Sequence, residues 1–126
     1  MRTLLLLLLL LVVACSSGIR IDESNTEVEI DVFSGLPNPR WQLTREEARE
    51  LQRKLNDLPR DSGALRETLG YRGFVIKNAN QRIHISNGLV ALERGDEQVF
   101  FRDAHGAEEW LLENAARRGY QRLLRR

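Results

Sequence analysis

The chain has 126 residues but a single cysteine, Cys15, so no intrachain disulfide can form and side-chain packing must hold the fold together. Histidine is nearly as scarce. The two present, His84 and His105, have no neighbour at a spacing typical of metal ligands. The sequence therefore predicts no metal site and no bound cofactor.

Sequence motifs of enzymes are also missing. There is no G-x-S-x-G, no phosphate-binding P-loop and no G-x-G-x-x-G. A histidine-based enzyme would need one of its imidazoles close to a carboxylate. His84 instead falls on the polar face of an expected strand, and His105 in the first turn of an expected helix. No catalytic residue is assigned, and a small enzyme is kept as the alternative.

Charge of one sign is not in excess. The chain carries 19 Lys and Arg against 18 Asp and Glu, and removal of residues 1–14 would take away Arg2 (19 − 1 = 18) and balance the charges. A balanced charge argues against general binding of nucleic acid.

Long apolar runs are confined to the N-terminus, which reads MRTLLLLLLLLVVACSS. The run over residues 4–15 is shorter than the roughly 20 apolar residues that a membrane-spanning helix needs. It follows the cation Arg2 and ends in small residues, which is typical of an export signal that is later removed. An ordinary signal peptide with a chance cysteine would share these features.

The residues Val12-Val13-Ala14-Cys15 resemble the lipobox of bacterial lipoprotein precursors. The resemblance implies a signal peptide over residues 1–14, a diacylglyceryl group on the Cys15 thiol, and an acyl group such as palmitate on the new amino terminus. Ser16 replaces the Asp that retains enterobacterial lipoproteins at the inner membrane. The implied location is therefore the outer membrane, facing the periplasm, with residues 15–26 as a lipidated, polar tether.

Residues 27–126 are expected to form one α+β domain, large enough for its own core. Apolar residues alternate with acidic ones over residues 27–32, which predicts a half-buried strand. Residues 44–58 predict an amphipathic helix, opened by a capping box from Thr44 to Glu47 and ended by Pro59. A short helical turn is expected over residues 64–70, and a second amphipathic helix follows Asp103 as its N-cap.

Between these helices the pattern predicts a four-stranded antiparallel meander. Asn87-Gly88 is the strongest hairpin signal, and turns at Gly95-Asp96 and over residues 78–81 extend the same register. The three turns bring one set of apolar side chains to a common face: Phe74, Ile76, Ile83, Ile85, Val90, Leu92, Val99 and Phe101. The expected fold is thus an N-terminal strand plus this meander, with both helices on one face of the sheet.

The stretch FSGLPNPRW, residues 33–41, is the first candidate interaction surface. Its two prolines fix the backbone, which suits a connector between strand and helix and also lowers the entropy cost of binding. Trp41, three residues before the helix cap Thr44, is expected to pack inside the domain. The predicted contact site is the tip of the loop: Leu36, Pro37, Asn38, Pro39 and Arg40.

Two further surfaces are weaker candidates. The outer face of the meander would gather Tyr71, Val75, His84, Leu89, Ala91 and Phe100, either as a partner site or beneath another part of the chain. The C-terminal sequence ARRGYQRLLRR is rich in arginine, which suits contact with anionic envelope material but equally suits a solvated helix end.

These observations lead to a hypothesis of function. We expect a small lipid-anchored protein of the cell envelope that binds another envelope protein or a cell-wall component. The segments FSGLPNPRW and LGYRGF resemble segments of uncharacterised exported bacterial proteins, which adds no activity. The alternatives are a small periplasmic enzyme and an inhibitor or accessory factor of an envelope hydrolase.

Overall fold

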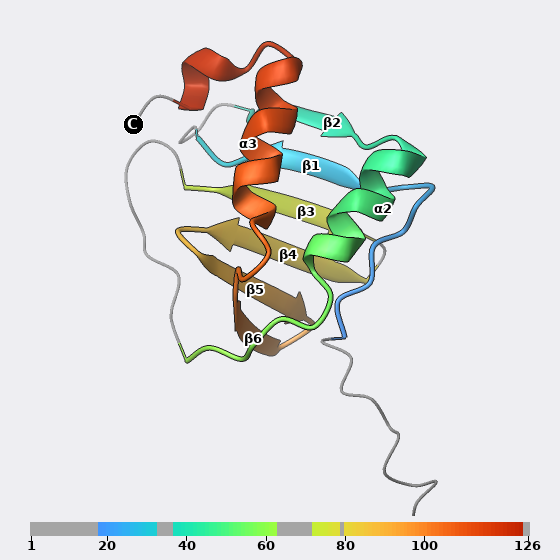
Figure 1. Cartoon of the computed structure of the whole chain (residues 1–126), viewed down its shortest axis with the longest axis vertical. Helices are drawn as coiled ribbons and strands as arrows, with labels where there is room; N and C mark the ends of the chain where they lie inside the picture. Colours follow the sequence, from blue (N-terminus) through green and yellow to red (C-terminus); the bar gives the residue numbers. More distant parts are fainter. Residues whose placement is uncertain (1–17, 33–36, 63–71, 79, 125–126) are drawn as a thin grey trace, which may run out of the picture.

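In a computed structural model, one antiparallel sheet of six strands carries two helices on the same face (Figure 1). The structure describes residues 18–32, 37–62, 72–78 and 80–124. The strands are β1 (Glu27–Ile30), β2 (Arg40–Gln42), β3 (Phe74–Asn78), β4 (Gln81–Ser86), β5 (Leu89–Arg94) and β6 (Glu97–Arg102). The helices are α2 (Arg45–Lys54), α3 (Ala107–Arg117) and the short η2 (Gln121–Leu124). The predicted α+β class is confirmed.

The meander has the predicted register. Ile83 pairs with Leu92 and Ile85 with Val90, and the pairing continues from Val90 to Phe101 on β6. The Asn87-Gly88 turn makes this register possible because both residues adopt positive φ, 51° and 80°. The resulting apolar face lies against α2 and α3 and forms the core.

The sheet has one strand more than the sequence predicts. The strand order is β2-β1-β3-β4-β5-β6, so β1 is an inner strand, paired with β3 on one side and β2 on the other. The Ile30 N–H donates to the Pro39 carbonyl at 3.0 Å, and Val28 lies opposite Trp41. A strand of three residues directly after two prolines is too short to show a period of two, which is why the pattern missed it.

The two helices begin and end at slightly different residues from those predicted. The Thr44–Glu47 capping box is present, but α2 stops at Lys54, before the predicted end, and Asp57 beyond it takes a left-handed conformation, with φ 53°. Leu55 and Leu58 are still buried, beyond the helix end. α3 begins at Ala107, so His105 precedes it. Asp103 nevertheless caps α3 from a distance, since its carboxylate accepts the N–H groups of Ala107 and Glu108.

Residues 18–26 differ from the expected tether. Ile19 and Ile21, the two apolar residues of that polar segment, are only 3% and 8% exposed and belong to the hydrophobic core. The folded unit therefore extends back to at least Gly18. The predicted helical turn over residues 64–70 lies outside the described residues. No helix in the described part of the chain has the length and apolar character needed to cross a membrane.

The Asn87-Gly88 turn generates the first prediction. Gly88→Val should lower the free energy of unfolding by about 1 kcal/mol or more, since a β-branched residue is strained at positive φ. A Cβ at Gly88 meets open space, so the loss would report backbone strain and not a clash. Gly88→Asn is the control, because Asn tolerates this conformation. Equal urea-unfolding midpoints for the Val variant and the wild type would contradict the assignment.

Candidate functional site

The predicted contact loop is partly built into the sheet. Asn38 accepts the N–H of Val32 at 3.1 Å and donates to the Glu29 carboxylate at 3.0 Å, so its side chain holds the two arms of the β1–β2 hairpin together. Partial burial would raise the pKa of Glu29, but hydrogen bonds from Asn38 and Lys77 bring it below its ordinary value. Asn38 thus has a structural task that the sequence did not indicate.

The five predicted contact residues therefore have different surroundings. Pro37 and Arg40 are exposed, whereas Asn38 and Pro39 are half-buried in the hairpin. Arg40 belongs to β2, and its guanidinium lies 3.9 Å from the carboxylate of Glu27. Leu36 lies outside the described residues. Among the four described residues of the predicted site, Pro37 and Arg40 are the exposed ones.

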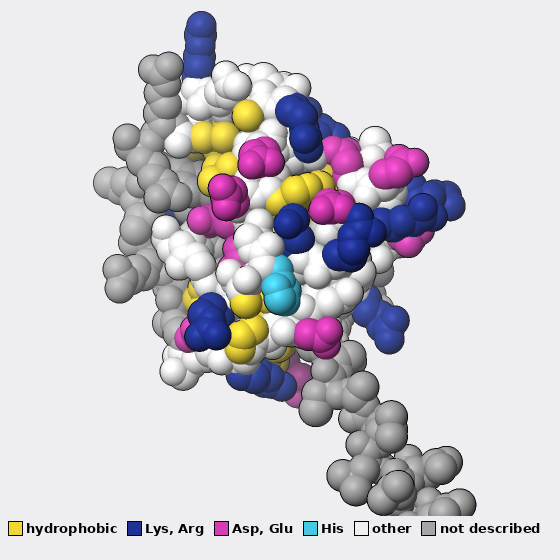
Figure 2. Space-filling view, in the orientation of Figure 1, with side chains coloured by type: hydrophobic (Ala, Val, Ile, Leu, Met, Phe, Trp, Pro, Cys, Tyr) yellow, Lys and Arg dark blue, Asp and Glu magenta, His cyan; other side chains and the backbone are white. Residues whose placement is uncertain are grey.

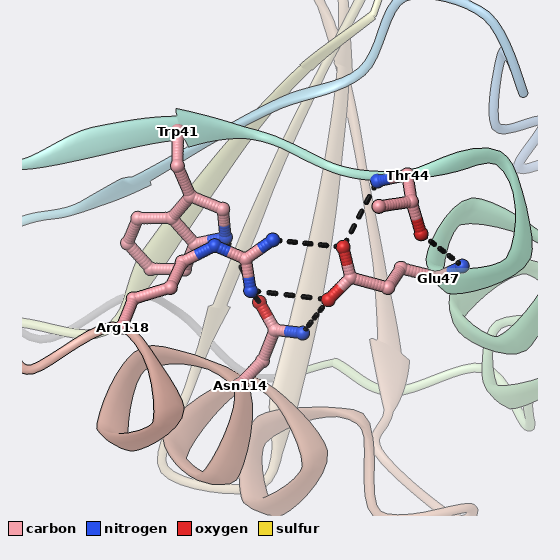
Figure 3. A network of polar contacts seen from close by, with 5 residues as sticks. All are labelled: Trp41, Thr44, Glu47, Asn114 and Arg118. Atoms are coloured by element: carbon pink, nitrogen blue, oxygen red, sulfur yellow. Dashed lines mark hydrogen bonds and ion pairs between the residues drawn. The ribbon is translucent and has the colours of Figure 1, made fainter.

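Trp41, the next residue, opens a network that joins β2 to both helices (Figure 3). Its indole N–H donates to Asn114 Oδ1 at 2.9 Å, and the Asn114 amide donates to Glu47 Oε2. The Tyr120 ring stacks on the indole at 5.5 Å between ring centres, and the Arg118 guanidinium lies 5.5 Å from the Trp41 ring centre. Trp41 is half-buried and bound within the domain, which agrees with the structural role expected of it.

Glu47 is the acceptor at the centre of this network. Arg118 donates to both of its oxygens, at 2.8 Å to Oε1 and 3.0 Å to Oε2, and the Thr44 N–H donates to Oε1 at 2.9 Å. The hydrogen bonds from Arg118 lower the pKa of Glu47 to about 2, against the opposing effect of partial burial. Asn114 is fully buried at the same point. The polar groups of the network are hydrogen-bonded to one another, so the network stabilises the fold.

Side-chain amides fasten the N-terminal segment in a second network, which we call the amide clasp: Gln52, Asn78 and Gln81. Gln52 accepts the N–H of Ile21 at 2.6 Å and donates to the carbonyl of Ile19 at 3.0 Å. A carboxamide offers the same donor and acceptor as a peptide group, so it can pair with the backbone as a strand would.

The other two members of the amide clasp hydrogen-bond to the backbone of the residues on either side of the isoleucines: Gly18, Arg20 and Asp22. Asn78 accepts the N–H of Asp22 at 3.1 Å and donates to the carbonyl of Arg20. Gln81 donates to the carbonyl of Gly18 at 3.2 Å and accepts the N–H of Arg20 at 3.4 Å. The segment is thus held from both sides while Ile19 and Ile21 enter the core.

The histidines occupy separate places. His84 is half-buried, and its Nε2 lies 2.7 Å from the backbone carbonyl of Arg72, which makes Nε2 the protonated nitrogen. His105 is exposed in the turn before α3. Within the described ranges, no group of three or more His, Cys, Asp or Glu residues is placed to hold a metal ion.

The two weaker candidate surfaces are smaller than expected. On the outer face of the meander, Val75 and Ala91 are buried, while Leu89 and Phe100 are half-buried. Of the two expectations for this face, burial of Val75 and Ala91 agrees with the second, cover by another part of the chain. Tyr71 lies outside the described residues. In the C-terminal segment Arg117 and Arg122 are exposed, but Arg118 is committed to Glu47.

Glu47 generates the second prediction. Its folded-state pKa, about 2, lies below the ordinary value of 4.5, so the folded protein binds fewer protons than the unfolded chain. The ion pair therefore stabilises the fold fully above pH 4.5, and this stability is lost as the pH falls towards 2. The difference corresponds to about 3 kcal/mol, as an upper figure because the Glu47 side chain is still 19% exposed.

Urea unfolding between about pH 7 and pH 2 measures this effect. Glu47→Gln should be less stable than the wild type at neutral pH, and the difference should shrink towards zero near pH 2. Glu46→Gln removes the same charge from the same helical turn at an exposed position and should follow the wild-type curve. Parallel curves for the wild type and Glu47→Gln would contradict the role of this carboxylate.

The surface that carries α2 and α3 is mixed in charge. Figure 2 shows basic and acidic side chains interspersed over it, with small hydrophobic areas between them. In the described part of the predicted loop the exposed residues are Pro37 and Arg40, at the β2 edge of the sheet. Comparison of the chain with protein-family models, with characterised proteins and with solved structures found no significant match.

Proposed function

We propose that this is a lipid-anchored protein of the bacterial cell envelope that acts by binding another envelope protein or a cell-wall component. The observation that carries the proposal is the sequence Val12-Val13-Ala14-Cys15 behind a short apolar run. In this proposal Cys15 carries diacylglycerol and palmitate at the outer membrane, facing the periplasm. Each buried methylene contributes about 0.8 kcal/mol, so several acyl chains give a stable anchor.

In this proposal the amide clasp would hold the folded domain close to the anchor. The clasp begins at Gly18, three residues after Cys15. Three residues span at most about 11 Å between Cα atoms. A domain attached in this way would lie against the membrane surface, with the end of the sheet near Gly18 facing the lipid.

The contacts of the histidines favour binding over catalysis. The alternative, a small periplasmic enzyme, would need an imidazole directed at a carboxylate or a reacting group. His84 instead bonds to the Arg72 carbonyl, and His105 stands exposed before α3. For a binding protein, the exposed residues Pro37, whose ring fixes its backbone, and Arg40 are the first contact candidates. They also fit an accessory factor that places a proline-stiffened segment against an envelope hydrolase.

The anchor provides the third prediction. Labelled palmitate should enter the wild-type protein in cells, and Cys15→Ala should abolish labelling and leave the signal peptide uncleaved. Cys15→Ser tests whether the thiol itself is needed and should behave like the Ala variant, since the hydroxyl forms no thioether. Mass spectrometry of the N-terminal peptide reads out both cleavage and lipid. An unmodified cysteine in the wild type would disprove the proposal.

The β1–β2 hairpin provides the fourth prediction. Substitution of Arg40 should affect binding, whereas substitution of Asn38 should affect stability. Arg40→Ala should leave the melting temperature nearly unchanged, since the pair with Glu27 is exposed and worth about 1 kcal/mol or less, and should weaken capture of partners by in-cell crosslinking. Asn38→Ala should lower the free energy of unfolding by about 1–2 kcal/mol, because it leaves the Val32 N–H and Glu29 without this partner. Full retention of all crosslinked partners in Arg40→Ala would exclude Arg40 as a contact residue.

A further inference from the structure

A pocket of about 270 Å³ opens between the start of the described chain and strands β5 and β6. Its lining includes Gly18, Arg60, Leu92, Arg94, Val99 and Phe101, with Glu97 at the same site. Leu92 and Phe101 are buried and Val99 is half-buried, so the floor is apolar. The volume is at the low end for ligand pockets, which suits a small group.

Two guanidinium groups give the pocket its polar chemistry. Arg60 lies with its guanidinium carbon 5.3 Å from the centre of the Phe101 ring, and Arg94 donates to the Gly18 carbonyl. Both arginines are exposed, and together they exceed the single charge of Glu97. A guanidinium has five N–H donors in a planar fork that matches phosphate oxygens, so the contact to Gly18 leaves Arg94 donors for a ligand.

Gly18 allows Arg94 to approach this closely. Its φ is +76°, and a Cβ on this residue would lie 2.9 Å from Nη2 of Arg94. The same glycine is the first described residue held by the amide clasp. The pocket is therefore directly connected to the segment that leads to Cys15, within about 11 Å of chain length.

We propose that this pocket binds the phosphate headgroup of an anionic phospholipid in the membrane that holds the lipidated Cys15. The inference rests on the proposed function, since the anchor is what brings the pocket to the lipid surface. The excess of positive charge selects an anionic headgroup, and a cation near an anionic membrane surface is attracted to it. Arg60 and Arg94 thus orient the domain on its membrane.

Photocrosslinking in vesicles tests this inference. The lipidated full-length mature protein is reconstituted into phosphatidylcholine vesicles with or without phosphatidylglycerol, each with a trace of phosphatidylglycerol that carries a photoactivatable headgroup. Crosslinked peptides are mapped by mass spectrometry. We expect crosslinks within residues 92–101, and competition by unlabelled phosphatidylglycerol but not by phosphatidylcholine.

Matched variants distinguish headgroup binding in the pocket from a general effect of positive surface charge. Arg60→Gln/Arg94→Gln should lower the crosslinks within residues 92–101 at least about fivefold, through loss of two cations at the membrane surface. Arg117→Gln/Arg122→Gln removes the same charge from exposed sites in α3 and η2 and should keep the wild-type yield. If the first pair fails to fold, Arg60→Gln alone leaves the Arg94 contact to Gly18 in place and should still reduce the yield.

The outcomes distinguish this inference from the proposed function. Absence of lipid on Cys15 in the same preparation would overturn both. Lipid on Cys15 with no crosslinks in residues 92–101, or equal competition by phosphatidylcholine, would overturn the headgroup site and leave the anchor intact. Equal losses in the two double variants would likewise overturn it, because they would assign the attraction to net charge.

Discussion

The carboxylate of Glu47 joins the parts of the domain that the sheet alone does not connect. It caps the start of α2 by accepting the Thr44 N–H, and it accepts hydrogen bonds from both terminal nitrogens of Arg118, the residue directly after α3. Through Asn114 it also reaches Trp41 on the edge strand β2. Because no disulfide is available, the relative position of α2, α3 and β2 depends on this shared acceptor and on the core beneath it. A buried network of this kind is costly unless each member is paired, and here each polar group has a partner.

Sequence patterns correctly predicted those parts of the fold in which the interacting residues lie close together in the sequence. The turn at Asn87-Gly88 sets a register, and the alternation on each side then decides which side chains enter the core. The Thr44–Glu47 capping box likewise involves only residues within a stretch of four. These features were read correctly because their partners lie close along the chain.

Features that depend on distant partners could not be predicted in this way. Gln52 lies 31 residues from Ile21, and Asn78 lies 56 residues from Asp22, so nothing local marks either amide as a partner for the N-terminal backbone. The segment looked like a tether because it is polar, yet its two isoleucines alternate, and that weak period-two signal was the clue to its burial. Asn114 carried a similar clue, as a polar residue three positions after Leu111 on the apolar side of α3.

The strand order relates the two candidate contact regions to each other. Arg94 is on β5 and Arg40 is on β2, with β4, β3 and β1 between them. Four strand spacings of about 4.8 Å amount to about 19 Å across the sheet. Gly18 contacts Gln81 and Arg94, at the end of the sheet where β4 begins and β5 ends, so Arg40 lies well to one side of the proposed anchor point. The amide clasp would then do more than bury two isoleucines. By removing freedom between the proposed anchor and the sheet, it would hold Pro37 and Arg40 at a fixed distance from that anchor, where a partner could meet them at a reduced entropy cost.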